Sequence, residues 1–521
     1  AYDVRGTGRS GVPDSTAGYR LTQLSADFKS VIDAVSPDQP VHVAAHDWGS
    51  IQTWESVTSP ELSSRIASYT SISGPDLGMA TAWLRSPRQP VDKVRQLTDS
   101  WYVFFFQSPV LPELAARTGS LDRLVALGAR KGTPWRRHRP AKRLPDKDKL
   151  NGIELYRANF LGKLAKPGGR PTTVPVQVLA PTLDDYVTTP LQVEAPKPYV
   201  ERLWTREIHG NHWVVEQSPT MIAGKITEFI DLVTDGREVR SLARPTREGE
   251  YAGRLVVITG AGSGIGRETA LAYARLGADI VVADIDDTAA KETVALVEGI
   301  GGLAWAHHLD VSSTKEWERF ADDVRERHGV PHIVVNNAGI GMGGGLLATS
   351  VDDWERILGV NLWGVIHGSR LFGAMLAEYG EGGHIVNVAS AAAFSPSRIL
   401  SAYGTTKAAV LSLTESLRAE LAYAGVGVTA VCPGFVDTNI SKTTTFVGVS
   451  EEEQERLSAH QQASYRRRNY TPQRLAAQIV DAVRKDKPVA AFSAEAKFFQ
   501  LGHRYVPALT RRIAKLDLNE L

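Results

Sequence analysis

The sequence predicts an α/β protein built from two domains, each with a parallel β-sheet. Short apolar runs alternate with longer helical stretches: PVHVAAH and VPVQVLAP in the first half, RLVVITG, DIVVADI and GHIVNVAS in the second. Parallel strands read as continuous apolar runs because helices cover both faces of the sheet. Residues 236–253 interrupt this alternation with a charged segment that contains Gly and Pro and has no apolar period. We therefore expect domains at 1–235 and 254–521, joined by a linker.

Composition excludes several classes of protein. Of the 521 residues, 43% are hydrophobic and 22% charged, which suffices to bury a core. Lys and Arg number 59 and Asp and Glu number 58, so the net charge gives no reason to expect nucleic-acid binding. The basic segments 136–143 and 466–468 are interpreted as solvated loops. No apolar stretch approaches the roughly 18 residues of a membrane-spanning helix. A single cysteine, Cys432, allows no internal disulfide and no cysteine-cluster metal site. We expect small-molecule chemistry without a metal in a reducing, cytoplasmic compartment.

The second domain opens with a glycine-rich loop between a strand and a helix. TGAGSGIG at 259–266 follows the first apolar run, and a helical segment follows the loop. Glycines let the backbone approach a pyrophosphate, and the helix N-terminus offers free N–H groups. Asp284 ends the next strand, 18 residues after Gly266. An acid there holds ribose hydroxyls and repels a 2′-phosphate, and no Arg or Lys stands just before Gly264 or just after Asp284, which favours NAD over NADP.

Three side chains later in this domain suit proton transfer to or from an alcohol. Ser390 ends the run HIVNVAS, and Tyr403 and Lys407 stand four residues apart on one helix face. A Lys ammonium beside a phenol stabilises the phenolate, which suits general acid–base work near neutral pH. The Ser hydroxyl can bond the oxygen of a carbonyl or an alcohol. Cys432 stands before Pro433 at a strand end and is interpreted as a buried apolar residue rather than a nucleophile.

These motifs together resemble the short-chain dehydrogenase/reductase family, from Leu255 to about Asn439. The further matching pieces are Asp310-Val311, NNAG at 336–339, VNLWG around Asn361, YGTTK at 403–407 and PGFVDT at 433–438. The resemblance implies a doubly wound Rossmann-type sheet and pairing of subunits into a homo-oligomer. It also implies that Asn361 completes a catalytic set with Ser390, Tyr403 and Lys407 through a water-linked proton path. The implied cofactor contacts are Gly260, Ser263, Gly264, Ile265, Gly266, Asp284, Asp310, Val311, Asn337, Ala338, Gly339, Tyr403, Lys407, Pro433, Gly434, Val436 and Thr438.

The first domain carries a strand, a sharp turn and a helix around His46-Asp47-Trp48-Gly49-Ser50. Small residues around a central reactive side chain are typical of a nucleophile elbow. The central residue is Asp47, and a carboxylate nucleophile attacks carbon that bears a leaving group, such as an epoxide or an alkyl halide. We interpret Ser50 as a helix residue beyond the turn.

A base and an acid follow Asp47 in the order that ester hydrolysis needs. Asp184 and Asp185 follow the run VPVQVLAP, and His209 and His212 come later in HGNHWVVEQSP. A His held by an acid can activate water. We favour His212 over His209 because Trp213 and a helix-like segment follow it.

This half resembles the epoxide hydrolase branch of the α/β-hydrolase fold, on DVRGTGRS at 3–10 and on HDWGS at the elbow. The resemblance implies a helical cap over about 75–169. The family pattern D-(F/Y)-V-x-x-P favours Asp185 over Asp184 as the acid that holds the catalytic His. It also implies that Tyr102 and Tyr156 polarise the epoxide oxygen. Two phenols aimed at that oxygen would stabilise the developing alkoxide. A haloalkane dehalogenase would use the same Asp47, with Trp48 on the halide, and an acyl-enzyme mechanism fits less well.

The N-terminus raises an expectation about hydrolysis. The sequence begins with Ala1, and AYDVRGTGRS has the pattern of a strand end that enters a loop. The family carries an H-G-x-P motif about 60–70 residues before the nucleophile, whereas Asp47 is 46 residues from Ala1. We expect the earlier strands of a truncated hydrolase domain to be missing, with oxyanion donors among them, and hydrolysis to be impaired.

The C-terminal tail and the fusion itself complete the expectations. Residues 495–516 repeat apolar residues at near-helical spacing among basic ones, which fits either a peripheral membrane contact or packing on the protein, with Pro507 as an interruption. The fusion suggests apolar, lipid-like substrates. We expect an NAD-dependent dehydrogenase that interconverts an alcohol and a ketone or aldehyde, fused to an epoxide hydrolase-like domain. The alternative for the first half is a non-catalytic lipid-binding or docking module.

Overall fold

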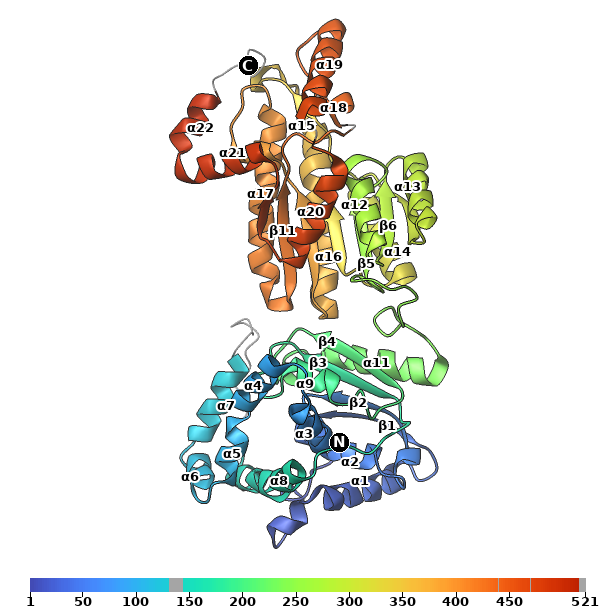
Figure 1. The fold of residues 1–521 in the computed structure, drawn as a ribbon, viewed down its shortest axis with the longest axis vertical. Coiled ribbons are helices and arrows are strands. Elements are labelled where there is room, and N and C mark those ends of the chain that lie inside the picture. Colours follow the sequence, from blue (N-terminus) through green and yellow to red (C-terminus); the bar gives the residue numbers. More distant parts are fainter. Residues whose placement is uncertain (131–143, 439, 469, 515–521) are drawn as a thin grey trace. The chain divides into compact units, whose positions relative to one another are not determined.

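The computed structural model describes residues 1–521 except 131–143, 439, 469 and 515–521 (Figure 1). The chain divides into two compact units, Ala1–Leu242 (unit 1) and Ala243–Leu521 (unit 2). The division falls inside the charged segment at 236–253. Each unit is an α/β structure around a parallel sheet, and a helical insert interrupts the first, so the predicted fold class is confirmed.

Unit 1 is built on a four-stranded parallel sheet in the order β1-β2-β3-β4. The strands are β1 (Val41–His46), β2 (Ile66–Ile72), β3 (Val176–Pro181) and β4 (Leu203–Ile208). The elements that surround the sheet are η1 (Thr16–Tyr19), α1 (Leu21–Val35), α2 (Trp48–Val57), η2 (Ser63–Arg65), α9 (Thr189–Glu194), α10 (Val214–Gln217) and α11 (Pro219–Asp235). All of β3 is buried, whereas His42 and Ala44 of β1 are exposed, because β1 is an edge strand of this sheet.

Between β2 and β3, the described residues form six helices that make up the cap, within the range 75–169 expected from the sequence. They are α3 (Leu77–Arg85), α4 (Pro90–Asp99), α5 (Trp101–Gln107), α6 (Leu111–Arg117), α7 (Ser120–Arg130) and α8 (Asp146–Ala165). Asp76 caps α3 by accepting a hydrogen bond from the Met79 amide at 2.8 Å. The basic segment 136–143 lies outside the described residues.

Unit 2 is built on a seven-stranded parallel sheet in the order β13-β11-β10-β8-β5-β6-β7. The strands are β5 (Leu255–Thr259), β6 (Asp279–Asp284), β7 (Leu303–His308), β8 (Ile333–Asn336), β10 (Gly383–Val388), β11 (Val426–Cys432) and β13 (Val489–Ala491). A small pair, β9 (Met342–Gly343) and β12 (Thr445–Phe446), lies outside this sheet. The strand order reverses between β5 and β8, and such a reversal places a ligand crevice at the carboxyl ends of the strands.

The helices of unit 2 alternate with its strands, as the sequence predicts. They are α12 (Gly264–Arg275), α13 (Asp287–Gly299), α14 (Thr314–His328), α15 (Val351–Leu358), α16 (Gly364–Tyr379), α17 (Ser401–Leu421), α18 (Ile440–Thr443), α19 (Glu451–Arg468) and α20 (Pro472–Arg484). Short turns are η4 (Leu346–Ala348), the π-helical η5 (Gly359–Trp363), η6 (Ala391–Phe394) and η7 (Ala422–Ala424). Residues 466–468, interpreted from the sequence as a loop, instead form the end of α19.

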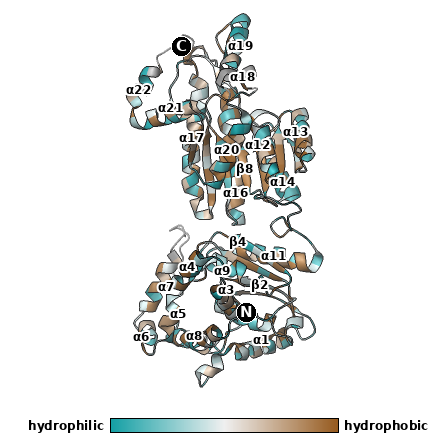
Figure 2. Cartoon of the chain, viewed as in Figure 1, coloured by the Kyte–Doolittle hydropathy of each residue, from teal (hydrophilic) through white to brown (hydrophobic). Residues whose placement is uncertain are grey.

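The apolar runs of the sequence become the buried strands. All five residues of β5 are buried, and so are the Val and Ile residues of β6 and β8. Figure 2 shows these strands in hydrophobic colours, with hydrophilic segments on the covering helices. Burial of both sheet faces explains why no polar alternation marks these strands in the sequence.

The tail forms two helices, α21 (Ala494–Tyr505) and α22 (Pro507–Ile513). Pro507 stands at the first position of α22, where its missing N–H costs nothing, so the tail bends between the helices. In the part of the chain that the structure describes, no helix is both long and apolar enough to cross a bilayer.

Candidate active sites

In unit 2, the residues predicted for the dinucleotide lie at the carboxyl ends of the strands. The glycine-rich loop follows β5, Asp284 ends β6, and the Asp310-Val311 pair follows β7. Asn337, Ala338 and Gly339 follow β8, and residues 433–438 follow β11. Parallel strands end at one edge of the sheet, so the topology brings these segments to one crevice on either side of the reversal in strand order.

Close packing at the glycine-rich loop requires glycine. Gly260 has φ +61°, and a Cβ there would lie 2.8 Å from Ala338 Cα. A Cβ on Gly266 would lie 2.2 Å from the Gly260 carbonyl oxygen. The Asn337 side-chain amide donates to the carbonyl oxygens of Thr259 and Gly260, at 2.9 and 3.1 Å. The loop is therefore held at the start of α12, where Ser263, Gly264 and Ile265 precede or enter the first helical turn.

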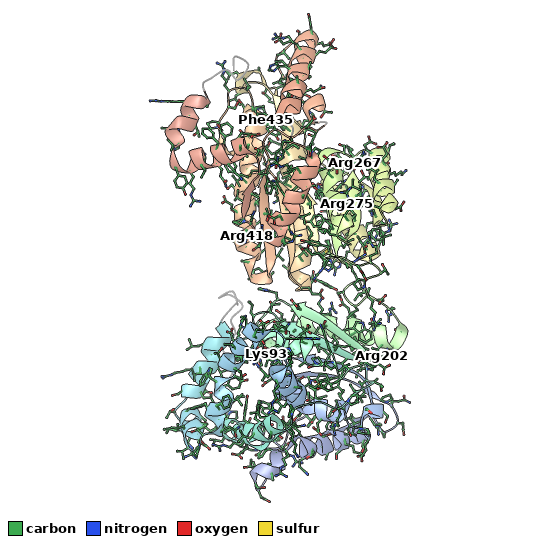
Figure 3. The ribbon with its side chains drawn as sticks, viewed as in Figure 1. Lys93, Arg202, Arg267, Arg275, Arg418 and Phe435 are labelled. Carbon is green, nitrogen blue, oxygen red and sulfur yellow. The ribbon has the colours of Figure 1, made fainter. Side chains whose placement is uncertain are left out.

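The Asp284 carboxylate faces this loop. Its Oδ2 accepts the Gly262 amide at 2.7 Å, and its Oδ1 accepts the Asp286 amide at 3.0 Å. Arg267 on α12, labelled in Figure 3, donates to Thr293 and to Glu292, each at 3.0 Å. Its charge is thus paired with a carboxylate. A glycine cradle with an acid at the end of the second strand fits a dinucleotide whose ribose hydroxyls bond Asp284.

The other residues predicted to contact the cofactor lie at the same end of the sheet. Val311 is buried, and a Cβ on Gly364 would meet its side chain at 3.0 Å. Asp310 accepts the amide and hydroxyl of Ser312, at 2.9 and 2.8 Å. Thr438 faces Gly264, where a Cβ would lie 3.4 Å from it. Pro433 accepts the Ala391 amide at 2.8 Å, Gly434 packs on Ser493, and Val436 is buried in the core.

Lys407 is the buried cation of this site. Its Nζ donates to the Val388 carbonyl oxygen at 2.9 Å and lies 5.8 Å from the centroid of the Tyr403 ring. Burial lowers the pKa of Lys407 to about 8, although Cys432 acts in the opposite direction. A Cβ on Gly339 would lie 3.4 Å from this Nζ and 3.2 Å from Asn361 Oδ1. Gly339 therefore leaves the space in which Lys407 and Asn361 approach each other.

Ser390 and Asn361 are held by the backbone around them. Ser390 is the N-cap of η6, and its Oγ accepts the Ala392 amide at 3.2 Å. α17, which carries Tyr403 and Lys407, packs against η6. Asn361 is fully buried in the π-helical turn η5; its side chain accepts the Ile340 amide at 2.8 Å and donates to the Ile340 carbonyl at 3.0 Å. Such turns recur at functional sites, and here the Asn361 amide fixes the loop after β8.

In unit 1, Asp47 occupies a sharp turn between β1 and α2. Its backbone has φ +51° and ψ −126°, outside the regions that ordinary residues favour, and its side chain is 42% exposed. Gly74 permits this turn, because a Cβ there would lie 2.2 Å from the Asp47 carbonyl oxygen. Ser50 is buried behind the turn and donates to the Gly74 carbonyl at 2.6 Å, so it belongs to the scaffold as predicted.

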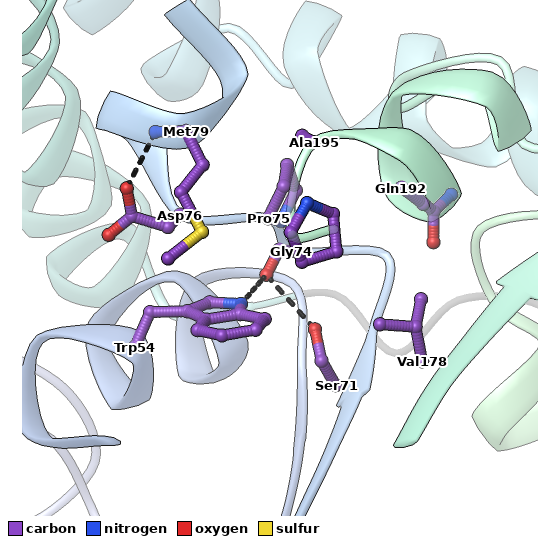
Figure 4. Close-up of a pocket in the computed structure, with 10 residues that line it drawn as sticks. Trp54, Ser71, Gly74, Pro75, Asp76, Met79, Val178, Gln192 and Ala195 are labelled. Carbon is purple, nitrogen blue, oxygen red and sulfur yellow. Dashed lines mark hydrogen bonds between the residues drawn. The ribbon is translucent and has the colours of Figure 1, made fainter. Parts of the chain in front are cut away.

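A small pocket backs onto this turn and lies apart from the Asp47 carboxylate. It is lined by Trp54, Gly74, Asp76 and Met79 among others. Figure 4 shows the Gly74 carbonyl between the Trp54 indole and the Ser71 hydroxyl, which donate to it at 3.1 and 3.4 Å. The pocket and its hydrogen bonds support the elbow from behind.

His212 links the nucleophile to an acid. Its Nε2 lies 3.7 Å from Asp47 Oδ1, and its Nδ1 lies 3.1 Å from Asp184 Oδ2. Burial lowers the pKa of His212, but the Asp184 charge and hydrogen bond, helped by Asp47, outweigh it and leave the pKa raised. Burial opposes ionisation of Asp184, yet His212 and two backbone amides hold its pKa below its ordinary value.

Two phenols face the same space from the cap. The rings of Tyr102 on α5 and Tyr156 on α8 lie 5.9 Å apart, edge to face. Burial raises the pKa of both far above that of a free phenol, and the Asp47 charge adds to the effect on each. Both phenols therefore keep their protons and can donate. Tyr186 joins them, with its ring 5.4 Å from Tyr102 and 5.0 Å from His212.

Comparison with known proteins agrees with this division of the chain. Residues 1–219 match the family model of the alpha/beta hydrolase fold, and residues 254–446 match that of the short chain dehydrogenase. "Probable oxidoreductase EphD" of Mycobacterium tuberculosis is 40% identical over 531 aligned positions, which cover 99% of this chain and 89% of that protein. The chain belongs to a family that fuses an α/β-hydrolase-fold domain to a short-chain dehydrogenase.

Unit 2 of this fusion protein also has single-domain relatives. The "C alpha-dehydrogenase" of Sphingobium sp. is 33% identical over 242 positions, covering 45% of this chain and 78% of that enzyme. The crystal structure of a short-chain dehydrogenase/reductase from Burkholderia phymatum in complex with NAD is 32% identical, covers 50% of this chain and 96% of that chain, and has a TM-score of 0.47.

The structure corrects one predicted member of the hydrolase site. Asp184, not Asp185, lies against His212; Asp184 is buried, whereas Asp185 is half-buried. Asp184 Oδ1 accepts the amides of Tyr186 and Val187, at 2.9 and 3.0 Å, and this turn directs Oδ2 towards His212. The family pattern D-(F/Y)-V-x-x-P favours Asp185, but the pattern carries no information on which of the two adjacent carboxylates the turn directs towards His212.

Sequence reasoning also missed Tyr186 and the residue that holds its loop. Gln96 on α4 accepts hydrogen bonds from the amide and the hydroxyl of Thr188, both at 2.8 Å, and donates to the Tyr186 carbonyl at 3.0 Å. The cap thereby holds the loop that carries Asp184. Gln96 has no signal in the sequence, because its partners are 90 and 92 residues away. Within the described residues, no cluster of three or more potential metal ligands is present.

Proposed function

We propose that unit 2 is an NAD-dependent dehydrogenase that interconverts an alcohol and a ketone or aldehyde. The observation that carries the proposal is the group formed by Lys407, Tyr403, Asn361 and Gly339 at the carboxyl edge of the sheet. Asp284, whose carboxylate faces the loop that would hold the pyrophosphate, favours NAD over NADP. A bound nicotinamide dinucleotide supplies the hydride acceptor or donor.

The side chains of this site manage the proton and the orientation of the substrate. Ser390 would bond the substrate oxygen, and Tyr403 would take the hydroxyl proton during oxidation and return it during reduction. Lys407, held by the Val388 carbonyl, places an ammonium beside the phenol and stabilises the phenolate. Asn361 keeps the loop after β8 in place through Ile340. Pro433–Thr438 would close the crevice from the β11 side.

The test is a screen of alcohols and ketones as substrates, in which NADH absorbance reports the reaction. Tyr403→Phe should lower kcat at least about 100-fold with little change in NAD binding, because the phenol proton is lost and the ring is kept. Tyr505→Phe, at an exposed tyrosine on α21, is the matched control and should leave the rate unchanged. Full activity of Tyr403→Phe with every substrate oxidised by the parent would refute the assignment.

For unit 1, we propose epoxide opening through Asp47. An Asp47 carboxylate oxygen bonds to an epoxide carbon, the ring C–O bond breaks, and Tyr102 or Tyr156 donates a proton to the leaving oxygen. Water then attacks the ester carbonyl while His212 accepts its proton, and Asp184 stabilises the imidazolium. The proton taken up by His212 returns to the tyrosinate, so the products are a diol, the free Asp47 carboxylate and the original neutral Tyr and His. The two protonated phenols favour this chemistry over alkyl-halide cleavage, which would not need them.

We further propose that hydrolysis by this 521-residue chain is weak. β1, the strand before Asp47, is an edge strand with exposed residues, so the position of the nucleophile is less constrained than in a buried strand. The chain should not open a styrene-type epoxide measurably, while NAD-linked oxidation survives. Robust epoxide turnover that Asp47→Asn abolishes would refute the impairment and support the Asp47 mechanism. If the parent does not hydrolyse epoxides and Asp47→Ala changes the affinity for an apolar ligand, unit 1 would be better described as a lipid-binding module.

The tail is proposed as a peripheral membrane contact of unit 2. Phe498, Leu501 and Tyr505 on α21 are each more than half exposed. Lys497 and Arg504 are exposed beside them. An apolar face bordered by cations suits an anionic lipid surface, and it agrees with an apolar substrate.

A further inference from the structure

Helices α4 and α5 of the cap are apolar on the side that faces away from the hydrolase site. Inward, Tyr102 and Phe106 contact the Tyr156 ring. Outward, large apolar side chains recur every three or four residues: Val91, Val94, Leu97, Trp101 and Phe104, each 51–79% exposed. A helix that is apolar all round is normally buried.

The same surface continues over the next two helices. Val110, Leu111 and Leu114 of α6 and its approach are exposed, and so are Leu124 and Leu127 of α7. α5 packs on α6, and α6 packs on α7, so these residues extend the stripe of α4 and α5. Figure 1 shows the four helices together along one side of unit 1, away from β1. We call these ten residues the outer cap face. Exposed apolar surface of this extent marks an interaction site.

The charges around the outer cap face are mainly basic. Arg88, Arg95, Arg117 and Arg123 are exposed, and Arg117 continues the three-residue spacing of Leu111 and Leu114. Among the acidic residues nearby, Glu113 pairs with Arg157 and Asp122 with Lys149. Asp99 pairs with Arg95 and so offsets one of these arginines, and Asp92 on α4 is half-buried. Lys93, labelled in Figure 3, is buried and donates to Ser86, so it does not belong to this surface.

We propose that the outer cap face docks on an anionic lipid surface. Aromatic and aliphatic side chains would enter the region between headgroups and acyl chains, and the arginines at the border would be attracted to anionic headgroups. A symmetric contact with a second copy would instead bring arginines against arginines. If the proposed epoxide opening is correct, α5 separates the lipid surface from the Asp47 site, and an apolar epoxide has a short path.

Vesicle flotation of the full chain measures membrane binding directly and needs no catalytic turnover. An absence of vesicle binding is therefore distinguishable from an absence of epoxide hydrolysis. The chain should bind phosphatidylcholine vesicles that contain phosphatidylglycerol more tightly than phosphatidylcholine alone, and added salt should weaken this binding. The triple variant Leu97→Ser, Trp101→Ser, Phe104→Ser should lose at least about tenfold in affinity.

Two further variants separate docking from general effects. Val35→Ser, Leu296→Ser, Ile300→Ser removes as many exposed apolar side chains elsewhere and should bind like the parent. Trp101→Phe should still bind but lose part of the fluorescence quenching by brominated phosphatidylcholine, because Trp101 would insert. This second measurement holds even if the triple variant folds poorly.

Three results would overturn the proposal. Parental binding by the triple variant would exclude the outer cap face. Loss of binding only in Phe498→Ser, Leu501→Ser, Tyr505→Ser would assign the contact to α21 alone. A dimer without vesicles that the cap triple variant converts to a monomer would show that a second copy covers this face.

Discussion

The pair formed by Asp184 and His212 supports a quantitative test of the hydrolase site. Both side chains are buried, and the 3.1 Å between Asp184 Oδ2 and His212 Nδ1 corresponds to about 5 kcal/mol of attraction at an effective dielectric constant of about 20. Desolvation offsets much of this attraction, and removal of one partner from a buried pair typically costs about 3–5 kcal/mol. Asp184→Asn should therefore destabilise unit 1 by about 3 kcal/mol where both groups are charged.

The cost should depend on pH in a defined direction. The pKa of His212 is raised in the folded chain, so its contribution is complete below its unfolded value of about 6.5 and is lost as the pH rises through the folded value. The pKa of Asp184 is lowered, so its contribution is complete above about 3.9 and is lost as the pH falls through the folded value. The penalty should be largest between about pH 4 and 6.5 and should decline as the pH rises through the raised pKa of folded His212. Above that folded pKa only a hydrogen bond, about 1 kcal/mol, is lost.

Calorimetry of the full chain measures this effect. The transition that NAD does not shift belongs to unit 1, and near pH 6 Asp184→Asn should lower its Tm by about 6–12 °C. Titration of the His212 ring by NMR should show a lowered pKa in the variant. Asp185→Asn is the matched control and should change the Tm by no more than about 2 °C. A larger loss in Asp185→Asn than in Asp184→Asn, or a penalty that grows at alkaline pH, would refute the reasoning.

Three further predictions follow from close packing, charge and burial. Gly74→Ala should destabilise unit 1 by about 1–3 kcal/mol in denaturant unfolding, because its Cβ would meet the Asp47 carbonyl at 2.2 Å; an unchanged midpoint would contradict the geometry of the turn. Asp284→Ala should raise the KM for NAD at least about tenfold and narrow the preference over NADP in steady-state assays, since the acid no longer bonds the ribose; equal KM values in parent and variant would exclude this role. Cys432 is buried with its pKa raised to about 12, so a disulfide reagent should modify it only after unfolding, and prompt labelling of the native chain would contradict its placement.

Local patterns in the sequence specify the fold class and the place where the chain divides into two units, and they bring together the residues of the proposed dehydrogenase site. Continuous apolar runs specify buried parallel strands, and chemistry in such sheets collects at the carboxyl ends, so Asp284, Ser390 and the glycine-rich loop could be placed from motif and strand order alone. Tyr403 and Lys407 share a helix face because of their spacing. These inferences depend on local periodicity, which the sequence carries directly.

Tertiary structure decided what depends on direction and on distant partners. Asp184 and Asp185 are adjacent and chemically identical, and the turn formed by the Tyr186 and Val187 amides determines which carboxylate reaches His212. The clamp from Gln96 joins residues about 90 positions apart in the chain. The outer cap face depends on the orientation of α5. Phe106 on one side of this helix packs against Tyr156, and Trp101 on the other side is exposed. An apolar run does not indicate which of its sides the fold will cover, because that depends on packing between segments remote in sequence.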